Sequence, residues 1–193
     1  MGSLSPKASD ALIPKYMFLT KGVGKHKDYL HSFELALRDA GIGKCNIVNV
    51  SSIIPPGCRV ISKEHGLKML KPGQIIFCVL SKNHTNEPHR LISAAIGAAV
   101  PSDPTMYGYI SEYHSFGETA EKAGRYAEYL AASMLAELHG LKIDLSKSWD
   151  QAKKELRIGD KRIRTMNVVQ SARGDRNGLW TTVVAAAVFI LEE

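Results

Sequence analysis

The sequence predicts an α+β fold in which helices are layered on β-sheet. Two amphipathic helical patterns, over residues 28–40 and 118–139, are separated by several β-branched or apolar stretches. The last two of these stretches flank Asn177-Gly178, a strong signal for an antiparallel hairpin. Strands and helices therefore interleave along the chain and include a hairpin, which is typical of layered α+β proteins.

The chain opens with a predicted strand, turn and helix. Lys15–Thr20 has the character of a strand, and Lys21–Gly24 is expected to form a turn. Apolar side chains then recur at helical spacing between Asp28 and Ala40. Gly41 follows and is suited to the left-handed position that ends a helix.

A second strand, Ile47–Val50, leads to the dipeptide Ser51-Ser52. Pro55-Pro56-Gly57 prevents regular structure from continuing, because proline lacks an amide donor. We expect a short strand over Arg59–Ser62 and a strongly apolar strand over Gln74–Leu80.

Residues 86–99 are interpreted as a helix. Asn86 can cap its N-terminus, and Pro88 suits its first turn. The segment is rich in alanine and glycine, so we expect it to pack closely against a sheet and to end before Pro101.

The remaining elements complete the α+β pattern. Tyr107–Phe116 predicts a strand, and Glu118–His139 predicts the longest helix. The segment Lys142–Ile158 is interpreted as an insertion with helical character around its tryptophan. Two final strands are expected over Arg162–Ala172 and Leu179–Leu191.

Length and composition predict one domain over residues 1–193, without internal repeats. The net charge of +6 permits a nucleic-acid-binding protein, but the basic residues are scattered. Their one dense cluster, Lys161, Arg162 and Arg164, opens a predicted strand, so a solvated basic face without nucleic acid is the better interpretation.

The sequence also favours a cytoplasmic protein. Its longest apolar run, Val183–Leu191, is too short to span a membrane, and the N-terminus has no pattern of a secretory signal. Cys45, Cys58 and Cys78 are odd in number and lack CxxC spacing, which indicates free thiols in a reducing compartment. We therefore expect neither a disulfide framework nor a metal site.

Ser51-Ser52 is the first candidate for chemistry. Serine pairs are common at strand ends, where their hydroxyls bond the local backbone, and this ordinary role is the default. A self-cleaving site would need a hydroxyl nucleophile beside a restrained peptide bond and a donor for the oxyanion. Ser52 could attack the Ser51 carbonyl, and Asn46 is an uncharged donor on the incoming strand. Asn46 could equally be an ordinary residue at a strand start.

The surroundings of this pair resemble the processing region of pyruvoyl-dependent arginine decarboxylases. The resemblance runs from about Phe18 to the C-terminus and is specific in the ordered set Asn46, Ser51-Ser52, Pro55-Pro56 and Glu112. The segments that carry it are Phe33-Glu-Leu-Ala-Leu37, Asp39-Ala-Gly-Ile-Gly-Lys-Cys-Asn-Ile-Val-Asn-Val-Ser-Ser-Ile-Ile-Pro-Pro56 with Gly57, Ile96-Gly-Ala-Ala-Val-Pro101, Gly108-Tyr-Ile-Ser-Glu-Tyr113 and Ala185-Ala-Ala187.

The resemblance implies a fold and a maturation step. The fold would be a layered α/β/β/α sandwich with mixed or antiparallel sheets. Cleavage between Ser51 and Ser52 would leave a small chain, residues 1–51, and a large chain, residues 52–193. Ser52 would become a covalent pyruvoyl cofactor, with Asn46 assisting the cleavage.

The resemblance also implies the reaction, which is decarboxylation of arginine to agmatine. Glu112 would act as the catalytic acid, for which its pKa must be raised. Tyr109, Ile110 and Tyr113 are expected to supply apolar surroundings, and His114 would share the face of Glu112. By composition alone, Glu112 would instead be an exposed carboxylate and His114 a surface histidine.

Substrate recognition requires a local acid, because a guanidinium is bound best by a carboxylate. Glu34 occupies the place of the family's guanidinium-binding acid, where some members carry Asp. Leu37 and Ile53 could line the path of the substrate methylenes, although both are also ordinary core residues. The resemblance further implies a homotrimer, or a higher multiple, with the active site between subunits. Two alternatives stay open: the same machinery acting on another amino acid, and an unprocessed, non-catalytic relative.

Overall fold

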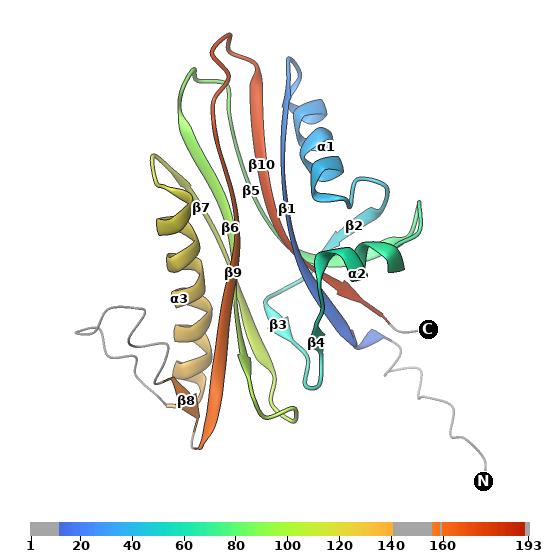
Figure 1. The fold of residues 1–193 in the computed structure, drawn as a ribbon, viewed down its shortest axis with the longest axis vertical. Coiled ribbons are helices and arrows are strands. Elements are labelled where there is room, and N and C mark those ends of the chain that lie inside the picture. Colours follow the sequence, from blue (N-terminus) through green and yellow to red (C-terminus); the bar gives the residue numbers. More distant parts are fainter. Residues whose placement is uncertain (1–11, 141–155, 159, 192–193) are drawn as a thin grey trace.

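The computed structural model describes residues 12–140, 156–158 and 160–191. Two five-stranded sheets pack face to face, and helices cover their outer faces (Figure 1). The first layer is formed by two helices, α1 (Tyr29–Ala40) and α2 (Lys63–Met69). The two sheets, which we call sheet A and sheet B, follow, and helix α3 (Ala120–Leu138) forms the last layer. This arrangement confirms the α/β/β/α sandwich.

Both sheets are mostly antiparallel. Parallel pairing occurs between β1 and β4 and between β2 and β5. Sheet A has the strand order β2 (Asn46–Asn49), β5 (Ile75–Thr85), β10 (Trp180–Ile190), β1 (Tyr16–His26) and β4 (Arg59–Val60). Sheet B has the order β3 (Ile53–Ile54), β7 (Gly108–Phe116), β6 (Leu91–Pro101), β9 (Lys161–Arg173) and β8 (Arg157–Ile158). The helices are α1 (Tyr29–Ala40), α2 (Lys63–Met69) and α3 (Ala120–Leu138).

Three layers of buried apolar side chains hold the sandwich together. The layer between the sheets includes Met17, Val79, Ile96 and Ile110. Burial of apolar surface on both faces of each sheet contributes most of the driving force for this packing. The layer between α1 and sheet A includes Phe18, Ala36, Ile42, Ile76 and Val184, and the contacts of α3 with sheet B include Ala95, Ala123, Ala127, Leu135 and Ile163.

The prediction of a helix over residues 86–99 is wrong, because this segment contains β6. All residues from Ile92 to Ala99 are buried, since one face of β6 meets sheet A and the other meets α3. A strand buried on both faces shows no alternation of polar and apolar residues, so its pattern resembles that of a buried helix. Asn86 caps no helix and instead belongs to the connection that leads from β5 in sheet A to β6 in sheet B.

The predicted turn at Lys21–Gly24 is also wrong, because β1 continues without interruption to His26. Its glycines serve close packing instead of chain reversal. A Cβ atom on Gly22 would collide with the Ala36 carbonyl oxygen of α1, and one on Gly24 would collide with the Ser32 carbonyl oxygen. The two glycines therefore allow α1 to approach the strand backbone.

Smaller corrections concern chain connections. The last two strands do not pair with each other, because β9 lies in sheet B and β10 in sheet A. Asn177-Gly178 lies in the crossing between them. The expected strand Arg59–Ser62 ends at Val60, and Ser62 instead caps α2 by accepting a hydrogen bond from the His65 amide. Most of the predicted insertion at 142–158, including its helical part up to Glu155, lies outside the described residues, and β8 forms at its end.

We expect the substitution Gly24→Ala to lower the free energy of unfolding by about 1–3 kcal/mol, the usual range for overpacking a tight interface. The added methyl group would push α1 away from sheet A. Denaturant unfolding measures the effect. Lys21→Ala is the matched control, because Lys21 lies exposed on the same strand and its truncation should change stability little. Equal stability of both variants would contradict the close approach of α1.

Candidate active site

The Ser51-Ser52 pair lies where the chain passes from one sheet to the other. Just before the pair, the Val50 amide donates to the Cys78 carbonyl of sheet A at 3.0 Å. Just after it, the Ser52 carbonyl accepts a hydrogen bond of 2.7 Å from the Ile110 amide of sheet B. The peptide bond between the two serines is therefore held from both sides, one sheet on each.

The residues that follow keep this crossing short. Ile53 and Ile54 pair with Tyr109 and Gly108, and Ile54 is fully buried. A tight turn then closes with the Cys58 amide donating to the Pro55 carbonyl at 3.1 Å. The proline pair thus ends β3 in a rigid turn, as predicted.

A mainly apolar cavity of about 290 Å³ adjoins Ser51. Such a cavity can enclose the aliphatic part of a small ligand beside the serine pair. Its lining residues are Leu12, Pro14, Val50, Ser51, Ile53, Pro55, Phe77 and Phe189. Ile53, a predicted substrate contact, therefore lies next to Ser51.

Glu112 lies on β7, two residues beyond the amide that bonds Ser52. It has the same parity as Ile110, so its side chain leaves β7 on the face toward sheet A. The side chain is exposed at the open margin of the sheets, yet the surrounding protein displaces enough water to raise the pKa of Glu112. The nearby His114 offsets part of this rise. A carboxyl group with a raised pKa can act as a proton donor.

The apolar surroundings of Glu112 differ from the prediction. Tyr109 and Tyr113 point to the opposite face of β7. There Tyr109 packs in the layer under α3, and the ring centroids of Tyr113 and Tyr126 are 4.7 Å apart. Burial, and to a lesser extent the Glu112 charge, raise the pKa of the Cys78 thiol to about 12. Cys78 itself belongs to the layer between α1 and sheet A, so it is not part of the surroundings of Glu112.

The structure does not bring all predicted site residues together. Asn46, at the far end of β2, donates its side-chain amide to the Gly73 carbonyl at 2.9 Å. Glu34 lies on α1, where its carboxylate accepts a hydrogen bond of 2.7 Å from Arg38 Nε. Leu37 is buried beneath the same helix. Because α1 covers the outer face of sheet A, these α1 residues are separated from Ser52 by that sheet within one chain.

Two hydrogen-bonding groups of the site belong to the backbone, so the residue types in the sequence could not predict them. The donor to Ser52 is the backbone amide of Ile110, and the acceptor for Val50 is the backbone carbonyl of Cys78. Only the pairing register of β3 with β7 and of β2 with β5 reveals them. Cys45, Cys58 and Cys78 are free thiols in the structure.

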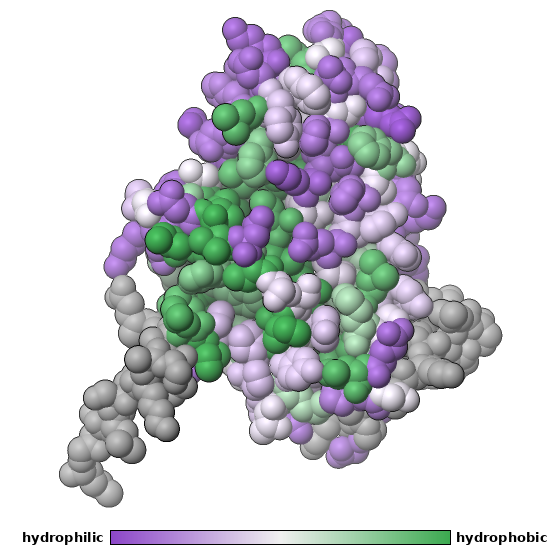
Figure 2. Space-filling view, turned by 180° about the vertical axis from the view of Figure 1, so that it is seen from behind, coloured by the Kyte–Doolittle hydropathy of each residue, from purple (hydrophilic) through white to green (hydrophobic). Residues whose placement is uncertain are grey.

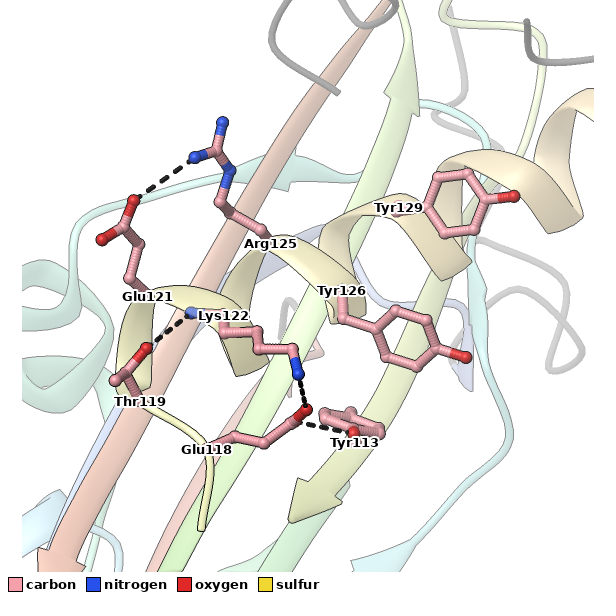
Figure 3. Close-up of a pocket in the computed structure, with 8 residues that line it drawn as sticks. All are labelled: Tyr113, Glu118, Thr119, Glu121, Lys122, Arg125, Tyr126 and Tyr129. Carbon is pink, nitrogen blue, oxygen red and sulfur yellow. Dashed lines mark hydrogen bonds and ion pairs between the residues drawn. The ribbon is translucent and has the colours of Figure 1, made fainter. Parts of the chain in front are cut away.

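A second hollow, of about 720 Å³, lies on the α3 side of β7 (Figure 3). Its acidic groups are already engaged, since Glu118 bonds both Lys122 and the Tyr113 hydroxyl, and Glu121 pairs with Arg125. The bonds to Lys122 and Tyr113 hold the pKa of Glu118 below its usual range. The lining residues are Tyr113, Glu118, Thr119, Glu121, Lys122, Arg125, Tyr126 and Tyr129.

The sandwich is open along the side where β5 and β7 run, at the rear of Figure 1. Figure 2, seen from behind, shows apolar residues gathered on this side, mainly on the left of the view. Large exposed apolar side chains here are Val48 of β2, Ile53 of β3 and Ile75 of β5. Exposed apolar area of this kind is typical of a contact surface.

Two further observations concern the described residues only. They contain no group of three or more His, Cys, Asp or Glu side chains that could hold a metal ion. None of their helices is long and apolar enough to span a membrane.

Comparison with known proteins identifies the family. Residues 16–193 match the family model of pyruvoyl-dependent arginine decarboxylase. The chain is 56% identical over 178 residues to a probable pyruvoyl-dependent arginine decarboxylase of Chloroherpeton thalassium, covering 92% of this chain and 98% of that protein. It is 54% identical over 180 residues to a pyruvoyl-dependent arginine decarboxylase of Methanococcoides burtonii, covering 93% of this chain and 100% of that protein. The match covers nearly the whole chain and includes both the crossing at Ser51-Ser52 and Glu112. This chain therefore belongs to the pyruvoyl-dependent arginine decarboxylase family.

Proposed function

We propose that this chain cleaves itself between Ser51 and Ser52 and then decarboxylates arginine to agmatine and carbon dioxide. The observation that carries the proposal is the restrained crossing: the Ser52 carbonyl bonds the Ile110 amide, two residues from the protonatable Glu112. The family membership and the names of its relatives support the same reaction.

Cleavage requires only groups within the serine pair and a donor. The Ser52 Oγ would attack the Ser51 carbonyl carbon, and the bond from that carbon to the Ser52 nitrogen would break, converting the amide into an ester. Loss of the Ser52 Cα proton and departure of the Ser51 carboxylate would leave dehydroalanine. Addition of water with release of ammonia would then give the pyruvoyl group at the start of residues 52–193. Two backbone hydrogen bonds restrain the segment during these steps.

The residues present fit a pyruvoyl group at position 52. Such a group supplies an electrophilic carbonyl that accepts the electrons released as carbon dioxide leaves. The Ser52 carbonyl oxygen would remain as its amide oxygen, and the Ile110 amide would stabilise negative charge there. Glu112, with its raised pKa, would deliver a proton to the substrate α-carbon.

Glu34 is our candidate for binding the substrate guanidinium, on the strength of the resemblance. Arg38 engages its Oε1 oxygen, so the second oxygen remains the better acceptor for a substrate. Glu is one methylene longer than Asp at this place, which changes the depth of a pocket and could favour another amino acid.

We further infer a homotrimer, or a multiple of it, with the active site between subunits. One chain keeps Glu34 and Asn46 apart from Ser52, and the side of the sandwich that carries Ser52 exposes apolar residues. Joining these groups across a subunit contact would complete the site and cover that surface.

Intact mass under denaturing conditions tests the cleavage. We expect two chains, residues 1–51 and 52–193, with Ser52 converted to pyruvoyl. Ser52→Ala should remain a single chain, because no hydroxyl is left to attack. Ser62→Ala, which removes a helix-capping hydroxyl elsewhere, should still be cleaved. Cleavage of the Ser52→Ala variant at the same bond would refute the mechanism.

Release of carbon dioxide from arginine, ornithine, lysine and histidine tests the reaction and the substrate, and we expect arginine to be turned over fastest.

Glu112→Gln should be cleaved normally but lose about 10²–10⁴-fold in kcat, because an amide cannot donate the proton. The protonated acid is the active form, so the wild-type rate should fall as pH rises through the pKa of Glu112, at higher pH than an ordinary Glu would give. Glu121→Gln, at an exposed ion pair, is the control. Faster ornithine turnover would overturn the substrate assignment.

Light scattering tests the assembly. We expect the mass of the matured protein to be three times 21.2 kDa, or a multiple of that value. Ile75→Lys, at the exposed start of β5, should shift the protein toward smaller species, whereas Leu179→Lys, on the β9–β10 connection, should not. A monomer that retains full activity would contradict an active site between subunits.

A further inference from the structure

The inward face of β5 changes character along its length. Phe77 and Val79 belong to the apolar layer between the sheets, whereas the next two inward residues are Ser81 and Asn83. Both polar side chains are almost completely buried, with exposed fractions of 2% and 5%. Buried polar groups are expensive unless they are hydrogen-bonded, so their partners show why they are tolerated.

Ser81 and Asn83 both donate hydrogen bonds to the opposite sheet. Ser81 Oγ donates a 2.7 Å hydrogen bond to the Tyr113 carbonyl, and Asn83 Nδ2 donates a 2.9 Å bond to the Ser115 carbonyl. Both acceptors are in β7. Two side chains of sheet A therefore hold the backbone of the strand that carries Glu112.

This part of β7 has little other support on its outer side. Among the described strands, β3 pairs only with Gly108 and Tyr109, so beyond Ile110 only β6 accompanies β7. Glu112 thus sits between two anchors. The Ile110 amide is bonded to Ser52, and the Tyr113 carbonyl is bonded to Ser81.

We propose that Ser81 is a positioning residue that fixes the β7 backbone beside Glu112 and so aims the carboxyl group at the site formed by Ser52. The inference rests on the proposed function, in which Glu112 is the proton donor. Ser81 touches neither substrate nor the reacting atoms; it acts through the Tyr113 carbonyl. Without its hydroxyl, β7 keeps its bond to Ser52 but loses the anchor nearest to Glu112 on the other side, and only the more distant bond from Asn83 to the Ser115 carbonyl remains there.

The substitution Ser81→Ala should lower kcat about tenfold and leave KM nearly unchanged, a loss equivalent to about one hydrogen bond. A loosened β7 lets the Glu112 carboxyl group meet more water, so its pKa falls and the alkaline limb of the rate profile moves to lower pH. His114, whose charge lowers the pKa of Glu112, is unchanged in this variant, and so is Cys78, whose pKa the Glu112 charge raises. Ser81→Thr retains the hydroxyl and should restore both values.

Hydrogen exchange provides a readout that does not depend on activity. Peptides covering residues 108–116 should exchange faster in Ser81→Ala than in wild type and Ser81→Thr, whereas cleavage at Ser51 and assembly size stay unchanged. Thr20→Val is the matched control, because it removes another buried hydroxyl that donates to a backbone carbonyl, that of Ala40, away from β7. If Ser81→Ala does not fold, Ser81→Cys takes its place with a much weaker donor.

The outcomes separate the inference from the function on which it rests. Wild-type protein without cleavage or decarboxylation would refute the proposed function itself. Active wild-type protein with unchanged kcat, pH limb and exchange in Ser81→Ala would overturn the role of Ser81 alone. An equal loss of kcat in Thr20→Val would show a general loss of stability and would likewise overturn it.

Discussion

The structure depends on one constraint, the crossing of the chain between two stacked sheets at residues 50–52. Sheet A holds the incoming end through the Cys78 carbonyl, and sheet B holds the outgoing end through the Ile110 amide. Because both anchors are backbone groups in regular strands, the position of Ser51-Ser52 follows from the register of the sheets. A chemically ordinary pair of serines thereby acquires a fixed place beside an apolar cavity, bonded to β7 two residues from Glu112.

Small residues make that register possible. Gly22 and Gly24 let α1 approach β1, and Gly97 lets α3 approach β6 so closely that a Cβ atom there would collide with the Ala127 carbonyl. The alanines of β6 and β10 are buried on both faces. Close layers leave room for few large side chains, so substitutions far from Ser52 can still displace the strands that position it.

The sequence predicted the fold class and most of its elements, whereas the roles of the predicted site residues stay predictions. Ser51-Ser52 and Glu112 were recognised because a specific ordered set of residues accompanies them, and α1, α3 and β7 were predicted from clear periodicity. The segment 86–99 was mistaken for a helix because a strand buried on both faces loses its alternation. The sheet exchange at Asn177-Gly178 and the backbone anchors of Ser52 depend on tertiary pairing, which no local pattern encodes. The faces taken by Tyr109 and Tyr113 could have been derived from parity with Ile110.

The position of β1 has a consequence for how the protein would refold before and after the proposed cleavage. This strand belongs to residues 1–51 but lies inside sheet A, between β10 and β4 of residues 52–193. The proposed cleavage after Ser51 would leave two fragments held together by a continuous hydrogen-bonded ladder, although nothing covalent would join them. The uncleaved chain can fold as a single molecule, whereas the cleaved protein, once denatured, would have to reassemble from separate pieces at a rate that depends on their concentration. The persistence of the cleaved protein would therefore depend more strongly on slow unfolding than that of the uncleaved chain.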